Sequence, residues 1–368
     1  MNMEFLGRIQ PDADELRDIL LLSRSKPSRV HIGELHIDRE VAKEITEKIL
    51  GEKWIEPVDE ATQKKCLLSH IRLWQRLGFD CLRLGSAFRF SASISFPTRY
   101  RETQDTAILP GKNRRWVEEN SAIINSWEDF ENYHWPSSED LDLWPFEFTA
   151  KNLPEGMGIW GCLSQGFLET VMFLAGYENL CFMLYDKPDL VQALFDRVGN
   201  IIMKGNEQLA GLDKLIGFFQ GDDMGFKTGT LFPPEAIRKY VLPWHKKLAD
   251  FAHRNNLLYV LHSCGKTDDL MEGFITDVKI DAKHSFDDGI MPVCEFKKKY
   301  DGRLAVIGGI DVDKLCRLEE KELRRYVRRV IEECTQTPGY VLGSGNSIAN
   351  YVPVDNFLIM IEEGFRFK

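Results

Sequence analysis

Residues 258–265 read Leu258-Tyr259-Val260-Leu261-His262-Ser263-Cys264-Gly265, a short apolar run that leads through a histidine and a cysteine into a glycine. A run of this length and composition, bounded by glycine, is typical of a buried strand. Side chains alternate between the two faces of a strand, so His262 and Cys264 project to the same side and can reach one ligand. Imidazole nitrogen and thiolate sulfur together suit Zn²⁺. The alternative is that both side chains only pack, as buried cysteines often do.

Similar apolar segments recur along the chain and alternate with amphipathic helical stretches, a pattern that indicates a parallel sheet covered by helices. Counting the first one quoted, there are eight: 29–33, 80–85, 158–162, 215–223, 258–264, 280–285, 304–309 and 340–344. Pro233 and Pro234 open one of the intervening helices, and residues 319–334 form another of about four turns. Eight strand–helix units predict an α/β fold, the (β/α)8 TIM barrel.

The remaining residues are predicted to be additions to this barrel. Residues 1–60 indicate an N-terminal helical extension with a short strand. Residues 89–154, rich in Arg, Trp, Asp, Glu and Pro, indicate a long insertion after the second strand that covers the barrel mouth. No Gly/Ser-rich linker divides the chain. We therefore expect a single domain over residues 1–368, a length that suits one large barrel.

Composition restricts the compartment and the partners. The formal net charge of −10, with dispersed Lys and Arg, argues against non-specific binding to nucleic acid or to an anionic membrane. No window approaches the roughly 18 apolar residues of a membrane span, and the first residues lack the layout of a signal peptide. The eight cysteines lie far apart and are expected to be reduced thiols. These features predict a cytoplasmic protein, and the acidic charge is compatible with a monomer or a homodimer.

In a TIM barrel the functional site lies on the loops at the carboxyl ends of the strands. The sequence concentrates polar side chains at the predicted strand ends, and we assign them three roles. The predicted metal ligands are His262 and Cys264. The predicted catalytic residues are Asp223, Glu34 and His284, and the predicted substrate-binding residues are Gln220, Asp222, His36 and Asn346.

The adjacent carboxylates Asp222 and Asp223 can bind a cation, shift each other's pKa, or supply one acid and one base. Neighbouring strand residues point to opposite faces, so one of the two faces the mouth, and we predict that it is Asp223. The alternative is that one of them caps a helix or pairs with an arginine. His284 is a third ligand, a base or a buried structural histidine. The helical residues His245 and His253 are expected to face solvent.

Several runs of the chain form one recognisable set. They are Phe219-Gln220-Gly221-Asp222-Asp223-Met224-Gly225, Pro243-Trp244-His245-Lys246 with Tyr240 before it, His262-Ser263-Cys264-Gly265, Gly308-Gly309-Ile310-Asp311 and the late Gly-Ser-Gly-Asn turn. Together they resemble the uroporphyrinogen decarboxylase superfamily. The resemblance covers residues 158 to the C-terminus well and the first 150 residues loosely. It implies a TIM barrel, in agreement with the strand count.

The superfamily has two branches, which differ at residues visible in this sequence. True decarboxylases use no metal or cofactor and carry an Arg-Gln-Ala-Gly-Arg motif near the N-terminus, whose arginines clamp substrate carboxylates. Residues 29–36 here present acidic and imidazole groups instead. Cobamide-dependent methyltransferases hold zinc with a His-x-Cys pair, matched by His262 and Cys264, and with a later cysteine whose place is taken by Asn346. A third donor could instead be Glu34, Asp223, His284 or Cys294.

The resemblance implies a zinc-dependent methyltransferase of anaerobic one-carbon metabolism. It would move a methyl group between a small methylated compound, such as a methyl ether, a methylamine or a thiol acceptor, and a cobalamin-type corrinoid. Zinc would lower the pKa of a substrate thiol or polarise an ether oxygen. The chain lacks a cobalamin-binding Asp-x-His-x-x-Gly segment, so a separate corrinoid protein would carry the cobamide. The alternatives are a uroporphyrinogen decarboxylase-like enzyme and a catalytically inactive barrel that acts as a binding subunit.

Overall fold

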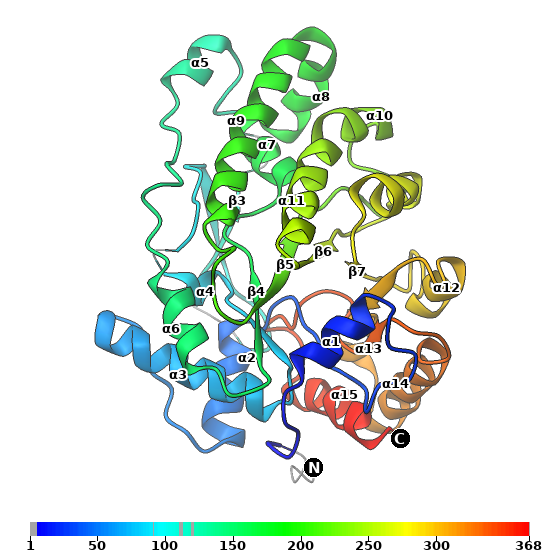
Figure 1. Cartoon of the computed structure of the whole chain (residues 1–368). Helices are drawn as coiled ribbons and strands as arrows, with labels where there is room; N and C mark the ends of the chain where they lie inside the picture. Colours follow the sequence, from blue (N-terminus) through cyan, green and yellow to red (C-terminus); the bar gives the residue numbers. More distant parts are fainter. Residues whose placement is uncertain (1–5, 91, 110–112, 119–120, 368) are drawn as a thin grey trace.

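The computed structural model describes residues 6–90, 92–109, 113–118 and 121–367 (Figure 1). Its centre is a parallel sheet of seven strands in the order β1-β4-β5-β6-β7-β8-β9, curled into a barrel-like wall with helices outside it. The predicted α/β fold of the TIM-barrel type is therefore confirmed. The strands are β1 (Cys81–Arg83), β4 (Gly158–Gly161), β5 (Leu215–Gly221), β6 (Leu258–His262), β7 (Ala282–His284), β8 (Ala305–Ile307) and β9 (Tyr340–Val341).

The first predicted strand, residues 29–33, lies beside β9 and takes the eighth position in the wall. Ile32 forms a parallel bridge with Leu342, and the Gly33 amide donates to the Leu342 carbonyl at 2.8 Å. The Leu342 amide donates in turn to the His31 carbonyl at 2.9 Å. All eight predicted strand segments thus follow one another around the wall, although the first forms an isolated bridge rather than a regular strand.

The helices precede, connect and follow these strands. Those before β1 are α1 (Ala13–Leu20), α2 (Arg39–Glu44), η1 (Ile45–Ile49) and α3 (Glu60–Arg76). Those between β4 and β7 are α7 (Phe167–Ala175), α8 (Tyr177–Asp186), α9 (Pro188–Glu207), α10 (Pro234–Ala236), η2 (Ile237–Val241), α11 (Leu242–Arg254), η3 (Asp268–Leu270) and η4 (Gly273–Val278). The last are α12 (Val293–Lys299), α13 (Val312–Arg317), α14 (Glu320–Cys334) and α15 (Val354–Arg366). The helices predicted after Pro233 and over residues 319–334 are confirmed by α10 and α14.

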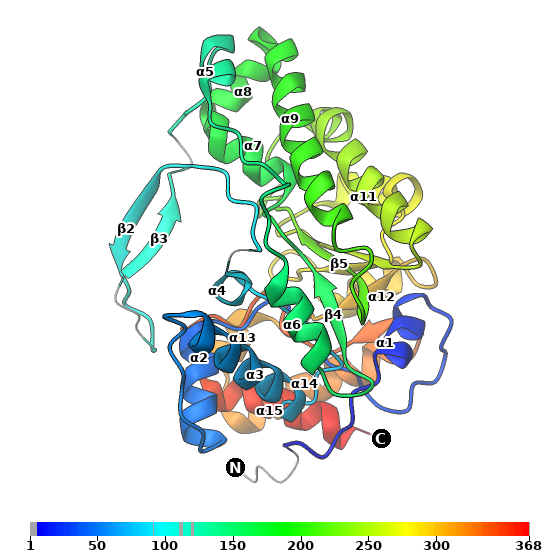
Figure 2. The ribbon, with the colours of Figure 1, turned by 60° about the vertical axis from the view of Figure 1, so that its left-hand side comes forward.

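The segment between β1 and β4 contains a hairpin that stands off the barrel (Figure 2). Its strands β2 (Tyr100–Gln104) and β3 (Asn113–Val117) pair antiparallel, and α4 (Ser86–Arg89), α5 (Trp127–Asn132) and α6 (Trp144–Asn152) complete the segment. Helix α6, at the end of this segment, packs against α3. Arg114 pairs with Asp38 at 3.1 Å, and the Leu109 amide donates to the Asn350 carbonyl. These contacts place part of the insertion along the rim formed by the loops after the first and last strand segments.

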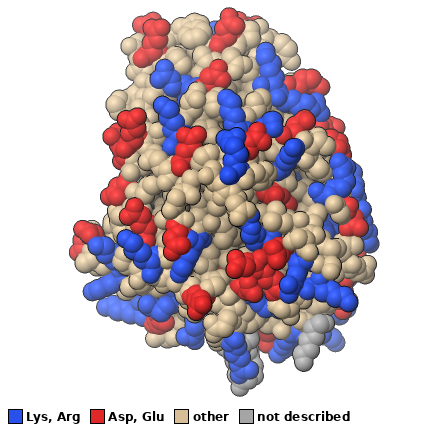
Figure 3. Space-filling model, viewed as in Figure 1, with Lys and Arg blue, Asp and Glu red and all other residues tan. Residues whose placement is uncertain are grey.

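The surface and the thiols agree with the expectations from composition. On the face drawn in Figure 3, acidic and basic side chains are mixed rather than gathered into one basic patch. All eight cysteines are free thiols. Among the described residues, no single helix has the length and apolar character to cross a membrane. One pair of helices, α7 and α8, meets that test only when taken together, and the pair is bent by 93°.

Helix α1 closes the amino-terminal end of the barrel. Its residues Leu16, Ile19 and Leu20 are buried against the inward side chains of the strands, among them Phe219 and Val260. Burying a side chain of this size stabilises the fold by roughly 1.5–3 kcal/mol relative to leaving it exposed. Helix α1 therefore fills the barrel interior at the amino-terminal ends of the strands. Only the opposite end, where the strands finish, remains for a site.

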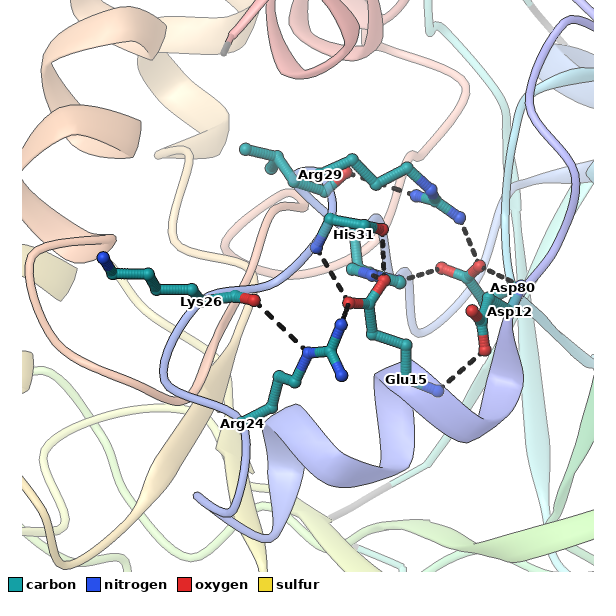
Figure 4. A network of polar contacts seen from close by, with 9 residues as sticks. Asp12, Glu15, Arg24, Lys26, Arg29, His31 and Asp80 are labelled. Atoms are coloured by element: carbon teal, nitrogen blue, oxygen red, sulfur yellow. Dashed lines mark hydrogen bonds and ion pairs between the residues drawn. The ribbon is translucent and has the colours of Figure 1, made fainter.

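A network of charged side chains fastens this helix to the first strand segments (Figure 4). The two ring nitrogens of His31 lie 2.8 Å from Asp80 and 3.0 Å from Glu15, and all three side chains are buried. Arg29 also pairs with Asp80, and Arg24 lies 2.9 Å from Glu15. Burial alone would raise the pKa of Glu15, but hydrogen bonds from Ser28 and His31 lower it to about 2. The network joins α1, residues 29–31 and the start of β1.

We expect Asp80→Ala to lower the free energy of unfolding by about 3–5 kcal/mol, because it leaves Arg29 and His31 without their buried carboxylate. Urea unfolding followed by circular dichroism measures the change. The exposed Asp14, on the same helix, is the matched control, and Asp14→Ala should change stability by less than about 0.5 kcal/mol. Equal effects of the two substitutions would show that the network is not stabilising.

Candidate metal centre at the mouth of the barrel

The loops that follow β5 and β6 touch each other backbone to backbone. Gly221 is in register with His262, and the Gly225 amide donates to the Cys264 carbonyl at 3.1 Å. A Cβ atom on Gly265 would lie 2.1 Å from the Gly225 carbonyl carbon, and Gly265 has a φ of +79°. Only glycine therefore permits this approach. The contact brings the residues just after the two strands together at the mouth.

Alternation along the two strands decides which side chains face that mouth. Leu258 and Val260 fill the barrel interior, and His262 continues the same face of β6. On β5 the inward residue is Phe219, and the same alternation continued past the strand end turns Asp223 inward. Asp223, His262 and Cys264 each offer one donor atom, and the three atoms lie within 4.8 Å of one another. Nε2 of His262 is 3.3 Å from the Cys264 sulfur and 3.5 Å from Asp223 Oδ1.

The charges at this cluster favour a cation. Burial, followed by the charge of Asp223, raises the pKa of the Cys264 thiol to about 12. Burial opposes ionisation of Asp223 as well, but the hydrogen bond with His262 holds the pKa of that carboxyl below its usual value. A divalent ion would supply the charge needed to deprotonate the thiol. Carboxylate oxygen, imidazole nitrogen and thiolate sulfur are all donors that zinc accepts, so the residues present fit this ion.

His284 lies behind His262 rather than beside the three donors. Its Nδ1 is 2.7 Å from Nδ1 of His262, and its Nε2 is buried without a hydrogen-bond partner among the described residues. Burial lowers the pKa of His284 well below its usual value, so its ring is neutral. If Nε2 of His262 binds a metal, its Nδ1–H is free to donate to His284, which would fix the orientation of the ligand. The predicted catalytic residue His284 thus contacts a candidate ligand, His262, rather than the candidate metal position.

Asn346, the residue expected at the place of the third cysteine, does reach the cluster. Its side-chain amide donates to the Cys264 sulfur at 3.2 Å, and the Ser285 hydroxyl donates to the same sulfur at 3.4 Å. Both contacts favour the thiolate over the thiol. Asn346 comes from the turn after β9 and Ser285 from the end of β7, so three separate loops converge on one sulfur atom.

Glu34 is buried next to the turn after β9. Its two oxygens accept hydrogen bonds from the Ser344 amide at 2.6 Å and the Ser344 hydroxyl at 2.7 Å. Burial nevertheless raises the pKa of this carboxyl to about 8, so it is protonated at neutral pH. His36 is half-buried beside Gly85, and its Nε2 lies 3.4 Å from Asp38. The structure gives His36 no contact with the three donors.

Two predicted substrate-binding residues face away from the mouth. Gln220 and Asp222 share the face of β5 that carries Phe218, between the barrel wall and the helices, and both are buried. The oxygens of Asp222 accept from the Leu168 and Glu169 amides, each at 3.0 Å, at the start of α7. Asp222 therefore caps a helix, which was the alternative for this pair, and we do not propose that it or Gln220 binds substrate.

The expectation that His245 faces solvent is wrong. His245 is fully buried, with Nε2 2.9 Å from Asp222 and Nδ1 2.6 Å from the Tyr259 hydroxyl. Its helical neighbours Leu248 and Ala252 are also buried, so helical spacing places His245 on the inner face of α11. His253 is half-exposed and pairs with Asp281 at 3.0 Å.

Two side chains near the mouth were not predicted. Glu169 lies at the start of α7, where burial and then the charges of Asp223 and Asp222 raise its pKa to about 8. Arg83 on β1 reaches across to the carbonyls of Phe219 and Leu35. A glutamate at the third position of a helix, where it can accept from the Gly166 amide, could have indicated Glu169, whereas nothing local distinguishes Arg83 from a surface arginine.

We expect Glu34→Gln to remove a pH dependence of stability. The pKa of Glu34 is raised from 4.5 to about 8 on folding, so its stabilising contribution is complete below pH 4.5 and is lost as the pH rises through 8. Between these values the wild type should lose up to about 1.4 kcal/mol per pH unit relative to the variant. Urea unfolding at pH 5 and pH 9 measures the difference, and the exposed Glu47→Gln is the control. Parallel pH dependences for wild type and Glu34→Gln would contradict the burial of an ionisable Glu34.

We expect Asp222→Ala and Asp223→Ala to differ in stability when both are measured with a chelator present, so that no metal contributes. Asp222→Ala leaves two helix amides and Nε2 of His245 without a partner and should cost at least about 3 kcal/mol. Asp223 is more than a third exposed, and its loss should cost about 1 kcal/mol or less. Thermal unfolding of the two variants checks this order, and the reverse order would contradict the assigned directions of the two side chains.

Comparisons with known proteins agree with this fold. A curated relative, the uroporphyrinogen decarboxylase of Geobacter sulfurreducens, is 27% identical over 187 residues; the match covers 50% of this chain and 52% of the relative, so the chain spans about half the length of that protein. A methyltransferase from Methanosarcina mazei has a similar structure, with a TM-score of 0.67, 14% identity and coverage of 98% of both chains. A B12-independent methionine synthase from a Shewanella species gives a TM-score of 0.49 at 11% identity, covering 83% of this chain and 86% of the other. The sequence profile described as Uroporphyrinogen decarboxylase (URO-D) matches residues 127–364, which is more than half of the chain. This protein belongs to the uroporphyrinogen decarboxylase family.

Proposed function

We propose that this protein is a zinc-dependent methyltransferase that moves a methyl group between a small methylated compound and a corrinoid held by a partner protein. The observation that carries the proposal is the cluster of Asp223, His262 and Cys264, whose donor atoms lie within 4.8 Å of one another at the carboxyl ends of the strands. Three protein donors around an otherwise open ion are the arrangement of a catalytic zinc site. The similarity in fold to a methyltransferase supports the same assignment.

Zinc at this position would act as a Lewis acid on a substrate oxygen, nitrogen or sulfur. The side chains around the donors then have separate tasks. His284 holds the ring of His262 through the contact between their Nδ1 atoms, and Asn346 and Ser285 donate to the Cys264 sulfur. Glu34, protonated at neutral pH, and Glu169, with a similarly raised pKa, are carboxyl groups that can give or take a proton near neutrality.

The donor set supports the proposed substrate class. A carboxylate ligand beside one thiolate leaves the ion more electrophilic than a site with two thiolates, which suits an uncharged methyl ether or a methylamine as well as a thiol acceptor. No step requires the chain itself to hold the corrinoid. We propose that a corrinoid protein docks over the mouth and brings the methyl-carrying cobalt to the substrate.

Uroporphyrinogen decarboxylation is the second candidate, because a curated relative carries that name. A cofactor-free decarboxylase of a polycarboxylate needs cationic groups around the bound substrate. Residues 31–36 carry His31, Glu34 and His36 in place of such cationic groups. Both ring nitrogens of His31 already contact Glu15 and Asp80. Arg83 and Arg89 are half-buried near the mouth, but both donate to backbone carbonyls. The second candidate is therefore weaker than the first.

Metal content is the first test. We expect protein purified with zinc present to hold one zinc per chain, and His262→Ala, Cys264→Ser and Asp223→Ala each to lose most of it. His253→Ala is the matched control, because His253 is a half-exposed histidine paired with Asp281 away from the mouth. Elemental analysis by mass spectrometry gives the stoichiometry, and circular dichroism confirms that each variant is folded. Full zinc content in the Cys264→Ser variant would contradict the proposed site.

Activity is the second test. With free reduced cobalamin in place of the corrinoid protein, the holoenzyme should methylate the cobalt from a methyl ether or methylamine, or demethylate methylcobalamin with a thiol. Absorbance of the corrinoid follows either direction, and the zinc-free variants should be at least about a hundredfold slower, because the ion activates the reacting group. A folded, zinc-free protein that consumes uroporphyrinogen would establish the second candidate instead. A folded protein that holds no metal and converts neither substrate would support the third possibility, a binding subunit.

A further inference from the structure

A pocket lies outside the barrel wall, between the loops that follow β6 and β7. It encloses about 410 Å³, including its open mouth. One side is apolar and is formed by Met271, Phe286, Ile290, Met291 and Phe296. The mixture of apolar and polar lining suits a small organic molecule rather than a single ion.

Lys283 is the buried charged residue on which the proposal for this pocket depends. On β7, Ala282 and His284 face the barrel interior, so Lys283 between them faces the helices. The side chain is only 4% exposed, and its Nζ lies 4.7 Å and 5.6 Å from the ring centres of Phe286 and Phe296. The amine therefore sits against the apolar wall of the pocket, not in solvent.

This amine has no carboxylate partner. Within the described part of the chain, no acidic side chain pairs with Lys283; its Nζ donates to the carbonyls of Ser285 at 2.7 Å and Ser263 at 3.4 Å. Burial lowers the pKa of Lys283 to about 8, so the amine is still mostly protonated at neutral pH. A buried charge is normally paired, and an ammonium group has three hydrogens to donate, of which these carbonyls take two.

The two acidic residues that line the pocket are already engaged. Asp268 pairs with Lys299 at 2.8 Å, and Asp287 accepts a hydrogen bond from the Gly289 amide at 2.7 Å. Neither makes an ion pair with Lys283, although the charges of Asp223 and Asp268 act on its amine from a distance. Lys283 is therefore a buried cation at the side of an apolar pocket, with one N–H left to donate. Such a site suits a ligand that joins an anionic group to an apolar body.

We propose that this pocket is a second ligand site that binds a small organic carboxylate, with the carboxylate on Lys283 and the apolar body against Phe286 and Phe296. The site is separate from the metal centre, because it lies on the other face of β7. The two are nevertheless neighbours: Ser285 lines the pocket, and its hydroxyl donates to the Cys264 sulfur. The proposal does not depend on zinc binding or on methyl transfer.

Isothermal titration calorimetry with phenylacetate and its neutral analogue phenylacetamide tests the site. Phenylacetate should bind the full-length protein with one site per chain, and the amide should bind at least about tenfold more weakly, because it cannot form the charged pair with the amine. Lys283→Met should abolish binding of phenylacetate. Lys321→Met, which removes an exposed lysine on α14, is the matched control and should leave binding unchanged.

Two further variants keep the test decisive. Ile290→Trp fills the pocket from a half-buried position while leaving Lys283 in place, and it should also abolish binding even if Lys283→Met does not fold. Cys264→Ser removes a metal donor and should bind phenylacetate normally. Loss of binding in Cys264→Ser but not in Ile290→Trp would show that the carboxylate binds the metal, and would overturn the proposal. No binding to the wild type, or equal binding of the acid and the amide, would overturn it as well.

Discussion

The contact between Gly225 and Gly265 is the constraint on which the candidate metal centre depends. Two loops can approach this closely only where neither carries a side chain, and the backbone of each occupies the space that a Cβ atom of the other would need. The parallel register of β5 and β6 sets Gly221 opposite His262, and the loop contact then places Asp223 beside Cys264. The positions of the three donors are thus set mainly by the backbone, which is less flexible than long side chains.

The carboxyl groups near the mouth show how environment assigns different tasks to the same chemical group. Asp222 is turned into the helix layer and holds the start of α7 together with His245. Asp223, one residue later, is held ionised beside His262. Glu34 and Glu169 are desolvated enough for their pKa values to rise to about 8. The same chemical group is therefore a helix cap at one position, an ionised carboxylate at the next, and a carboxyl with a raised pKa at two others.

The end of the barrel away from the mouth is closed by buried contacts. Helix α1 fills the amino-terminal opening, and the network of Glu15, His31 and Asp80 ties it to the wall. The loops that carry the candidate site lie at the opposite end of the same wall. Such an arrangement is common where a rigid scaffold carries a site on its loops. The Lys283 pocket belongs to the same loop region and adds a buried cation to it.

The sequence by itself determined the architecture, because strand and helix periodicity is local: all eight apolar segments occupy consecutive positions in the wall. It also determined that His262 and Cys264 share a face and that Asp223 points inward, since a strand alternates with a period of two. The same rule, applied to Gln220 and Asp222, would have turned both away from the mouth. Only the tertiary structure decided that Asn346 reaches Cys264 across 82 residues, that His284 stands behind His262, and that His245 meets Asp222. These contacts depend on the curl of the sheet and on the placement of helices upon it, which no short stretch of sequence encodes.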